Sequence, residues 1–211
     1  MDFQELMRRR RMVRSFTDAE IDLELINSLV KLSLRSPTAG NTRGVSWLIL
    51  SGKQQTDTYW ELTTTKEWRS RSKRWPNLAK APVVALSLVS PSAYVERYRE
   101  QDKLNSGLGI SEDAWPIPYW FGDAGFATFA LLLAARNAEL GACFLGNFRG
   151  EENLLGCLGV PTGVRLFGTV LIGHLGEQDW PSRSLERPTP TEDERISYGY
   201  WGLDSCRGPL P

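Results

Sequence analysis

The stretch from Asp123 to Arg136 constrains the fold most, because it carries a helix-forming pattern with almost no polar face. Its side chains are mainly Ala, Leu and Phe, so no polar stripe recurs at helical spacing. Asp123 is a candidate N-cap for this helix. Such a helix must be buried all round, by the rest of the fold or by a partner subunit.

The composition indicates a single globular domain over residues 1–211. With 25 basic and 25 acidic residues, the balanced charge gives no general reason to expect nucleic acid or an anionic membrane as a partner. No apolar run approaches the roughly 18 residues of a membrane helix. Cys143, Cys157 and Cys206 lack metal-binding spacing, and the start of the chain lacks a secretory segment. We therefore expect a cytoplasmic protein.

Helix-type and strand-type patterns alternate along the chain, which favours a mixed fold of helices and strands. Asp22 is a second possible N-cap, after the capping-box spacing at 17–20. The expected helices are a short one at the start of 6–14, which leads into an extended piece, then 22–35, one or two within 53–75, 123–136 and a short one within 147–158. The expected strands are 45–50, 82–89, 141–146 and 165–173. The proline-containing tail from about residue 176 should be extended.

Residues 91–121 form the least periodic part of the chain and are rich in aromatic side chains. Long irregular segments in compact domains are often lids or binding loops. Trp115, Tyr119, Trp120 and Phe121 could cover a planar ligand, or they could simply pack the segment onto the core. The sequence leaves both interpretations open.

Two other segments carry polar groups suited to a ligand. The loop from Ser36 to Gly44 offers small donors and acceptors, and Pro37 ends the preceding helix. Near the N-terminus, Arg10, Arg11 and Arg14 are either a solvated basic arm or an anion site, because forked guanidinium donors suit a phosphate.

The sequence lacks the residues for several common catalytic centres. His174 is the single histidine, which disfavours a histidine-based triad or a multi-histidine metal site. Neither a GxGxxG motif after a first strand nor a P-loop is present. With few acid or base candidates, no catalytic side chain and no metal ligand are assigned. Such a chain suits an organic cofactor that supplies the chemistry.

Three motifs together resemble the FMN-dependent nitroreductase family. They are Arg10-Arg-Met-Val-Arg14-Ser-Phe16, Ser36-Pro-Thr-Ala-Gly-Asn41, and the apolar helix 123–135 followed by Leu140-Gly-Ala. The resemblance covers nearly the whole chain. It implies an α+β three-layer sandwich with a central mixed sheet flanked by helices, and an obligate homodimer with one FMN site at each end of the subunit interface. The helix at 123–136 would then form the dimer core.

The resemblance also implies roles for individual residues. Arg10 and Arg14, with Arg11 and Met12 between them, match the phosphate and ribityl contacts, although Met12 stands where serine is common. Ser36, Pro37, Thr38 and Asn41 match the flavin-binding loop. Arg43 would face the pyrimidine edge, but Arg43-Gly44-Val45 replaces the commoner Gln-Pro-Trp turn. Leu145 and Gly146 fall where a backbone N–H reaches toward flavin N5. Arg183 or Arg187 resembles a C-terminal basic residue that closes on the phosphate.

The function that the resemblance implies is an FMN-dependent oxidoreductase. Hydride from NADH or NADPH would pass through flavin N5 to a nitro, quinone or similar small-molecule acceptor in a ping-pong exchange. Two alternatives stay open. One is a specialised flavin enzyme of the same fold, such as a dehalogenase, an oxidase or a flavin-destroying enzyme. The other is a flavin-binding protein without turnover.

Overall fold

The computed structural model describes residues 2–71, 75–180, 182–191, 193–199 and 201. These residues belong to two compact units, Met1–Asp179 and Trp180–Pro211. The second unit contains the short 3₁₀ turns η5 (Arg183–Glu186) and η6 (Asp193–Arg195). Cys206 lies outside the described residues.

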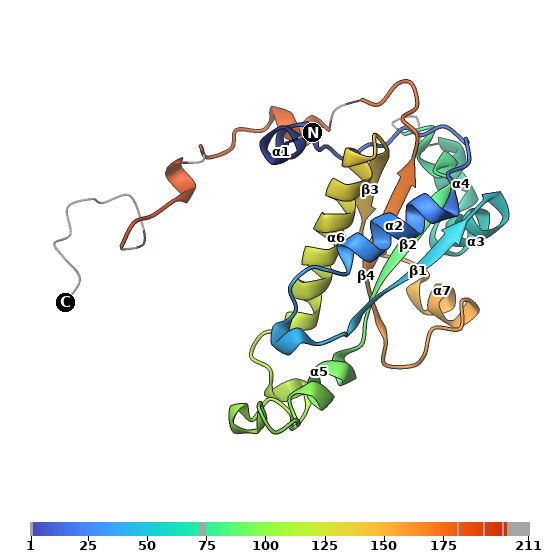
Figure 1. The fold of residues 1–211 in the computed structure, drawn as a ribbon. Helices are drawn as coiled ribbons and strands as arrows, with labels where there is room; N and C mark the ends of the chain where they lie inside the picture. Colours follow the sequence, from blue (N-terminus) through green and yellow to red (C-terminus); the bar gives the residue numbers. More distant parts are fainter. Residues whose placement is uncertain (1, 72–74, 181, 192, 200, 202–211) are drawn as a thin grey trace. The chain divides into compact units, whose positions relative to one another are not determined.

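A four-stranded sheet forms the centre of the first unit (Figure 1). Its strands are β1 (Val45–Ser51), β2 (Val83–Val89), β3 (Gly141–Leu145) and β4 (Arg165–Gly173), in the order β1-β2-β4-β3. All four match the expected strands. The three pairings between them are antiparallel, so the expectation of a mixed sheet is wrong for the described part of the chain. Strand direction depends on the path of the connections, which an apolar pattern does not encode.

Helices cover both faces of the sheet, which gives the expected α+β three-layer arrangement (Figure 1). Along β2, Val84 and Leu86 pack on one side, where α3 (Lys53–Thr63) and α7 (Glu151–Cys157) lie. Ala85 points to the other side, toward α2 (Leu23–Ser33) and α6 (Tyr119–Asn137). This alternation follows from the two-residue period of a strand. Both faces of β2 are buried, so the strand is apolar except for Ser87, whose hydroxyl accepts a hydrogen bond from Thr128 Oγ1 at 3.3 Å.

Two helix starts illustrate what the sequence could and could not locate. Asp22 caps α2 as expected, because its carboxylate accepts a hydrogen bond from Glu24 N at 2.9 Å. Asp123 does not cap α6, which begins at Tyr119. Asp123 instead lies inside the helix with a side chain that is 3 % exposed. Helical spacing cannot distinguish a capping aspartate from one that binds neighbouring segments.

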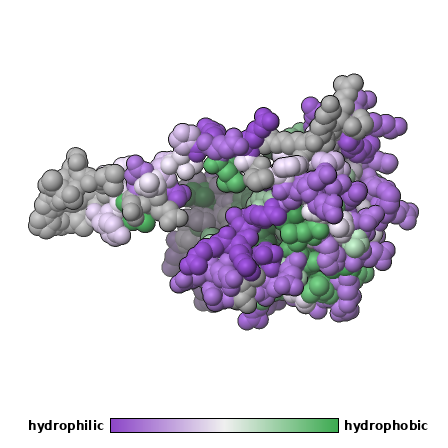
Figure 2. Space-filling model, turned by 90° about the horizontal axis from the view of Figure 1, so that it is seen from above, coloured by the Kyte–Doolittle hydropathy of each residue, from purple (hydrophilic) through white to green (hydrophobic). Residues whose placement is uncertain are grey.

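Of the two ways in which α6 could be buried, the rest of the chain alone does not cover the helix on all sides. Phe126 is 55 % exposed and Phe129 is 40 % exposed. On the adjoining helix α2, Leu32 is 56 % exposed. Hydrophobic surface interrupts the mainly hydrophilic exterior in Figure 2. A single copy of the chain therefore leaves part of this helical face uncovered.

The remaining helices are short: α1 (Phe3–Arg9), α4 (Lys66–Arg71) and α5 (Pro91–Arg97). Residues 91–121 contain α5 and two 3₁₀ turns, Leu104–Ser106 and Glu112–Ala114, before α6 begins. Trp115 and Trp120 are buried in this segment around Tyr94. None of the described helices is long and apolar enough to cross a membrane.

Candidate functional site

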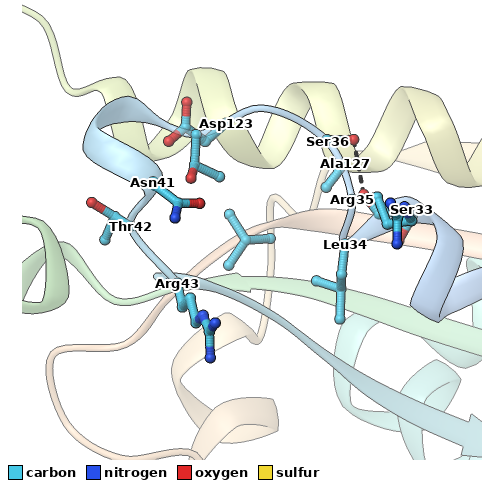
Figure 3. A pocket seen from close by; sticks show the side chains of 11 residues that line it. Ser33, Leu34, Arg35, Ser36, Asn41, Thr42, Arg43, Asp123 and Ala127 are labelled. Atoms are coloured by element: carbon cyan, nitrogen blue, oxygen red, sulfur yellow. Dashed lines mark hydrogen bonds between the residues drawn. The ribbon is translucent and has the colours of Figure 1, made fainter.

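A polar hollow of about 490 Å³ lies between the end of α2, the following loop and α6 (Figure 3). The loop contributes Ser36, Thr38, Asn41 and Arg43, and α6 contributes Asp123. Pro37 is exposed and does not line the hollow. The Arg43 and Arg35 side chains, which both line it, make no hydrogen bond or ion pair with any described residue. The hollow therefore combines two arginines that form no ion pair in the described part of the chain with small hydrogen-bonding groups and the Asp123 carboxylate.

The loop conformation depends on local hydrogen bonds and on two left-handed residues. Gly40 has φ 63° and Asn41 has φ 55°, a region that Gly and Asn tolerate better than most residues. Thr42 Oγ1 donates to Ala39 O at 2.6 Å. From α6, Asp123 Oδ2 accepts a hydrogen bond from Ala39 N at 2.9 Å. These contacts fix the short 3₁₀ turn η1 (Ala39–Asn41).

The N-terminal arginine segment lies along β3. Val13 N donates to Ala142 O at 2.9 Å, and Phe144 N lies 3.4 Å from the Met12 sulfur. Arg14 donates to Met12 O at 3.2 Å, and its guanidinium carbon lies 5.4 Å from the centre of the Trp75 ring. The segment is therefore fixed to the sheet edge by backbone and side-chain contacts. It is not a detached basic arm.

The three arginines of this segment differ in their charge balance. Arg11 forms an ion pair with Asp179, whose side chain is 6 % exposed. The charge of Arg11 is thus compensated within the chain, and it is a poor candidate for an added phosphate. Arg10 is half-buried and makes no side-chain ion pair or hydrogen bond in the described part of the chain. Arg10 and Arg14 remain available to an anion.

A second hollow, of about 440 Å³, opens beside Leu145 and Gly146 at the end of β3. Its walls are largely aromatic and come from the region that reads in the sequence as polar surface helices. They include Trp60, which is 3 % exposed and stacks on Trp68 with ring centres 6.2 Å apart. Sequence reasoning missed this hollow. The available signal was the clustering of Trp60, Trp68 and Trp75 within a short polar stretch.

Hydrogen bonds fix the chain next to Gly146. Thr169 Oγ1 donates to Asn147 Oδ1 at 2.8 Å, and Asn147 Nδ2 donates to Tyr59 Oη at 3.2 Å. Burial raises the pKa of Tyr59, so this phenol stays protonated at neutral pH. Burial also raises the pKa of the neighbouring Cys143 thiol to about 11, which makes it a poor nucleophile.

The expected acceptor-binding aromatics divide into two groups. Trp115 and Trp120 are 6 % and 3 % exposed and pack edge-on against Tyr94, with ring centres 6.0 Å from it. They anchor the segment, as the packing alternative anticipated. Tyr119 is 45 % exposed and Phe121 is half-buried, so these two remain accessible. Burial and then the hydrogen bond to Asp123 raise the pKa of Tyr94, which keeps its hydroxyl a donor.

Within one chain the two hollows do not meet. The polar hollow lies on the α2 and α6 side, next to Val45 on the edge strand β1. The aromatic hollow lies on the α3 side, next to Leu145 on the opposite edge strand β3. At about 4.8 Å between neighbouring strands, three strand spacings alone separate the edges by roughly 14 Å.

Arg183 and Arg187 are exposed residues of the second unit.

An antiparallel sheet between two helical layers, with two hollows beside it and no metal-binding cluster among the described residues, defines an α+β protein. The Nitroreductase family model matches residues 7–174. The chain belongs to the nitroreductase family.

Relatives and solved structures agree with this assignment. A protein of Archaeoglobus fulgidus, provisionally named NADH dehydrogenase/NAD(P)H nitroreductase, is 25 % identical over 168 residues, covering 78 % of this chain and 80 % of that protein. A provisionally named nitroreductase of Exiguobacterium sibiricum, solved with FMN, superposes with a TM-score of 0.72 at 14 % identity, covering 94 % and 97 % of the two chains. An FMN-dependent nitroreductase of Clostridium difficile gives 0.62 at 16 % identity, covering 93 % and 98 %.

Proposed function

We propose that this protein is an FMN-dependent NAD(P)H oxidoreductase. Family membership supports the proposal, together with Arg10, Arg14 and Arg43, whose side chains form no ion pair in the described part of the chain. The chemistry that bound FMN would supply is hydride exchange at N5, from NADH or NADPH to a nitro, quinone or similar small acceptor in a ping-pong manner. No side-chain acid or base needs to be assigned for hydride transfer.

The chain's own residues fit such a ligand. Arg10 and Arg14 would hold the phosphate, because guanidinium groups bind a doubly charged anion through forked hydrogen bonds. Asn41 and Arg43 would hold the polar edge of the ring system. The backbone at Leu145 and Gly146, beside the aromatic hollow, would lie against its reactive edge.

We further propose that two copies of the chain form each site. Arg14 lies over Trp75, a wall residue of the aromatic hollow on the α3 side, whereas the Ser36 loop lines the polar hollow on the α2 and α6 side. One chain would therefore not present both to the same ligand. The exposed phenylalanines of α6 and the neighbouring leucines of α2 provide an apolar surface for a second copy. A homodimer would bury this surface and bring the loop of one copy to the arginines of the other.

The acceptor site would include the accessible residues Tyr119 and Phe121, whose rings suit planar molecules. A specialised flavin enzyme of the same fold remains the alternative if residues 91–121 impose a different acceptor. A flavin-binding protein without turnover is the second alternative.

Anaerobic mixing with NADH or NADPH tests the proposal. The purified flavin-loaded protein should lose its yellow absorbance within seconds to minutes, and then regain it on addition of a quinone or nitroaromatic acceptor. Yellow colour that persists with both nucleotides would support binding without turnover. Bleaching followed by failure to oxidise with any member of an acceptor panel would favour the specialised enzyme.

A further inference from the structure

We infer that Tyr94 and Asp123 are positioning residues of the flavin site, which hold the loop 36–44 in its ligand-binding conformation. The inference rests on the proposed function, which assigns this loop to the flavin. In this inference, α5 and the first turns of α6 support the loop. The sequence left open whether the aromatic residues of this region cover a ligand or pack the segment onto the core.

The central contact is a shared, buried carboxylate oxygen. Asp123 Oδ2 accepts from Tyr94 Oη at 2.8 Å and from Ala39 N at 2.9 Å. Tyr94 is fully buried and Asp123 is 3 % exposed. A buried carboxylate is costly unless hydrogen bonds compensate it, and such bonds are stronger away from water. The pair therefore ties α5, α6 and the start of η1 together.

Two backbone contacts reinforce this attachment. Arg97 Nε donates to Gly40 O at 2.8 Å, and both terminal nitrogens of Arg97 bind Asp102 at 2.7 Å. At the end of the loop, Ser90 N donates to Gly44 O at 2.9 Å. The loop is thus held at Ala39, Gly40 and Gly44 from the same side.

The two glycines permit this close approach. A Cβ atom at Gly40 would lie 2.7 Å from Cε2 of Tyr98, and one at Gly44 would lie 2.3 Å from Cε2 of Tyr94. Both aromatic rings therefore pack directly against the loop backbone. Because the loop contains left-handed Asn41, a rigid support lowers the cost of keeping its side chain ready for a ligand.

Tyr94→Phe tests the hydrogen bond while keeping the ring that packs on Gly44. The dissociation constant of FMN should rise by about tenfold, and the Ala39 amide should exchange its proton about tenfold faster. A tenfold change is about the scale of one hydrogen bond to a charged group. Flavin fluorescence and NMR hydrogen exchange measure these effects, at a temperature where circular dichroism shows the variant to be folded. Tyr98→Phe is the matched control, because its hydroxyl has no hydrogen-bond partner among the described residues, and it should change neither quantity.

Asp123 variants separate hydrogen bonding from charge. Asp123→Asn can place its carbonyl oxygen at the position of Oδ2 and should stay within about threefold of wild type in FMN affinity, whereas Asp123→Ala should lose at least about tenfold. A large shift of the flavin midpoint potential in Asp123→Asn, with unchanged affinity, would indicate a direct electrostatic role and overturn pure positioning.

The Asn41→Ala variant distinguishes the proposed flavin site from the proposed positioning role of Tyr94 and Asp123. If Asn41→Ala weakens FMN binding but Tyr94→Phe does not, the positioning inference fails and the flavin site stands. Faster Ala39 exchange with unchanged FMN affinity in Tyr94→Phe also overturns the inference. A wild-type protein that does not bind FMN would refute the proposed function itself.

Discussion

At the scale of single residues, Arg14 is the most informative position, because it lies on the sheet edge with its guanidinium over Trp75. Arg14→Ala should weaken FMN binding by about 1.5 to 3 kcal/mol, or roughly ten- to a hundredfold in Kd, the range for a hydrogen bond to a charged group. Riboflavin lacks the phosphate and should bind almost unchanged. Titration of the apoprotein with both flavins measures this difference, with Arg8→Ala on the exposed face of α1 as control. Equal losses for both flavins would exclude a phosphate contact.

At the scale of elements, β2 determines the stability of the sheet, because it pairs with β1 and β4 and is buried on both faces. Leu86 is fully buried in the layer beneath α3 and α7. Leu86→Ala should lower the free energy of unfolding by about 2–5 kcal/mol, since it removes buried methyl groups and leaves a cavity. Urea denaturation measures the loss. Ile110→Ala, at a side chain that is 75 % exposed, should change it little. A loss below about 1 kcal/mol for Leu86→Ala would mean that the site collapses on the cavity.

At the scale of the whole molecule, the uncovered face of α6 connects assembly to ligand binding. Phe126 is 55 % exposed in the single chain, so Phe126→Glu should leave the subunit folded. It should convert a dimer into monomers and weaken FMN by more than about tenfold, because a buried unpaired carboxylate is costly and the two half-sites would separate. Sedimentation velocity with flavin absorbance follows both effects. The control is Cys157→Glu, at an exposed position of α7 on the opposite face of the sheet, which should preserve the dimer. A Phe126→Glu dimer with full FMN would contradict the proposed interface.

Local patterns were sufficient for most elements and for some of the site. The apolar runs located all four strands, and Asp22 marked the start of α2, because strand burial and capping depend on neighbours in sequence. The loop residues that the sequence indicated as ligand contacts line one hollow in the structure: Ser36, Thr38, Asn41 and Arg43. Arg11 could not be separated from Arg10 and Arg14, because its partner Asp179 is remote in the sequence.

The sequence by itself determined the four strands of the described sheet and most of the helices, but not α5 or the start of α6 at Tyr119. It also determined that the chain forms an α+β fold and which segments carry the motifs of its family. Only the tertiary structure decided strand direction, the burial of Trp115 and Trp120, and the role of Asp123 inside α6. It also placed Arg14 over Trp75 of the aromatic hollow and the Ser36 loop in the polar hollow on the other face of the sheet. The physical reason is that periodicity and capping are short-range, whereas these features arise from contacts between residues far apart along the chain.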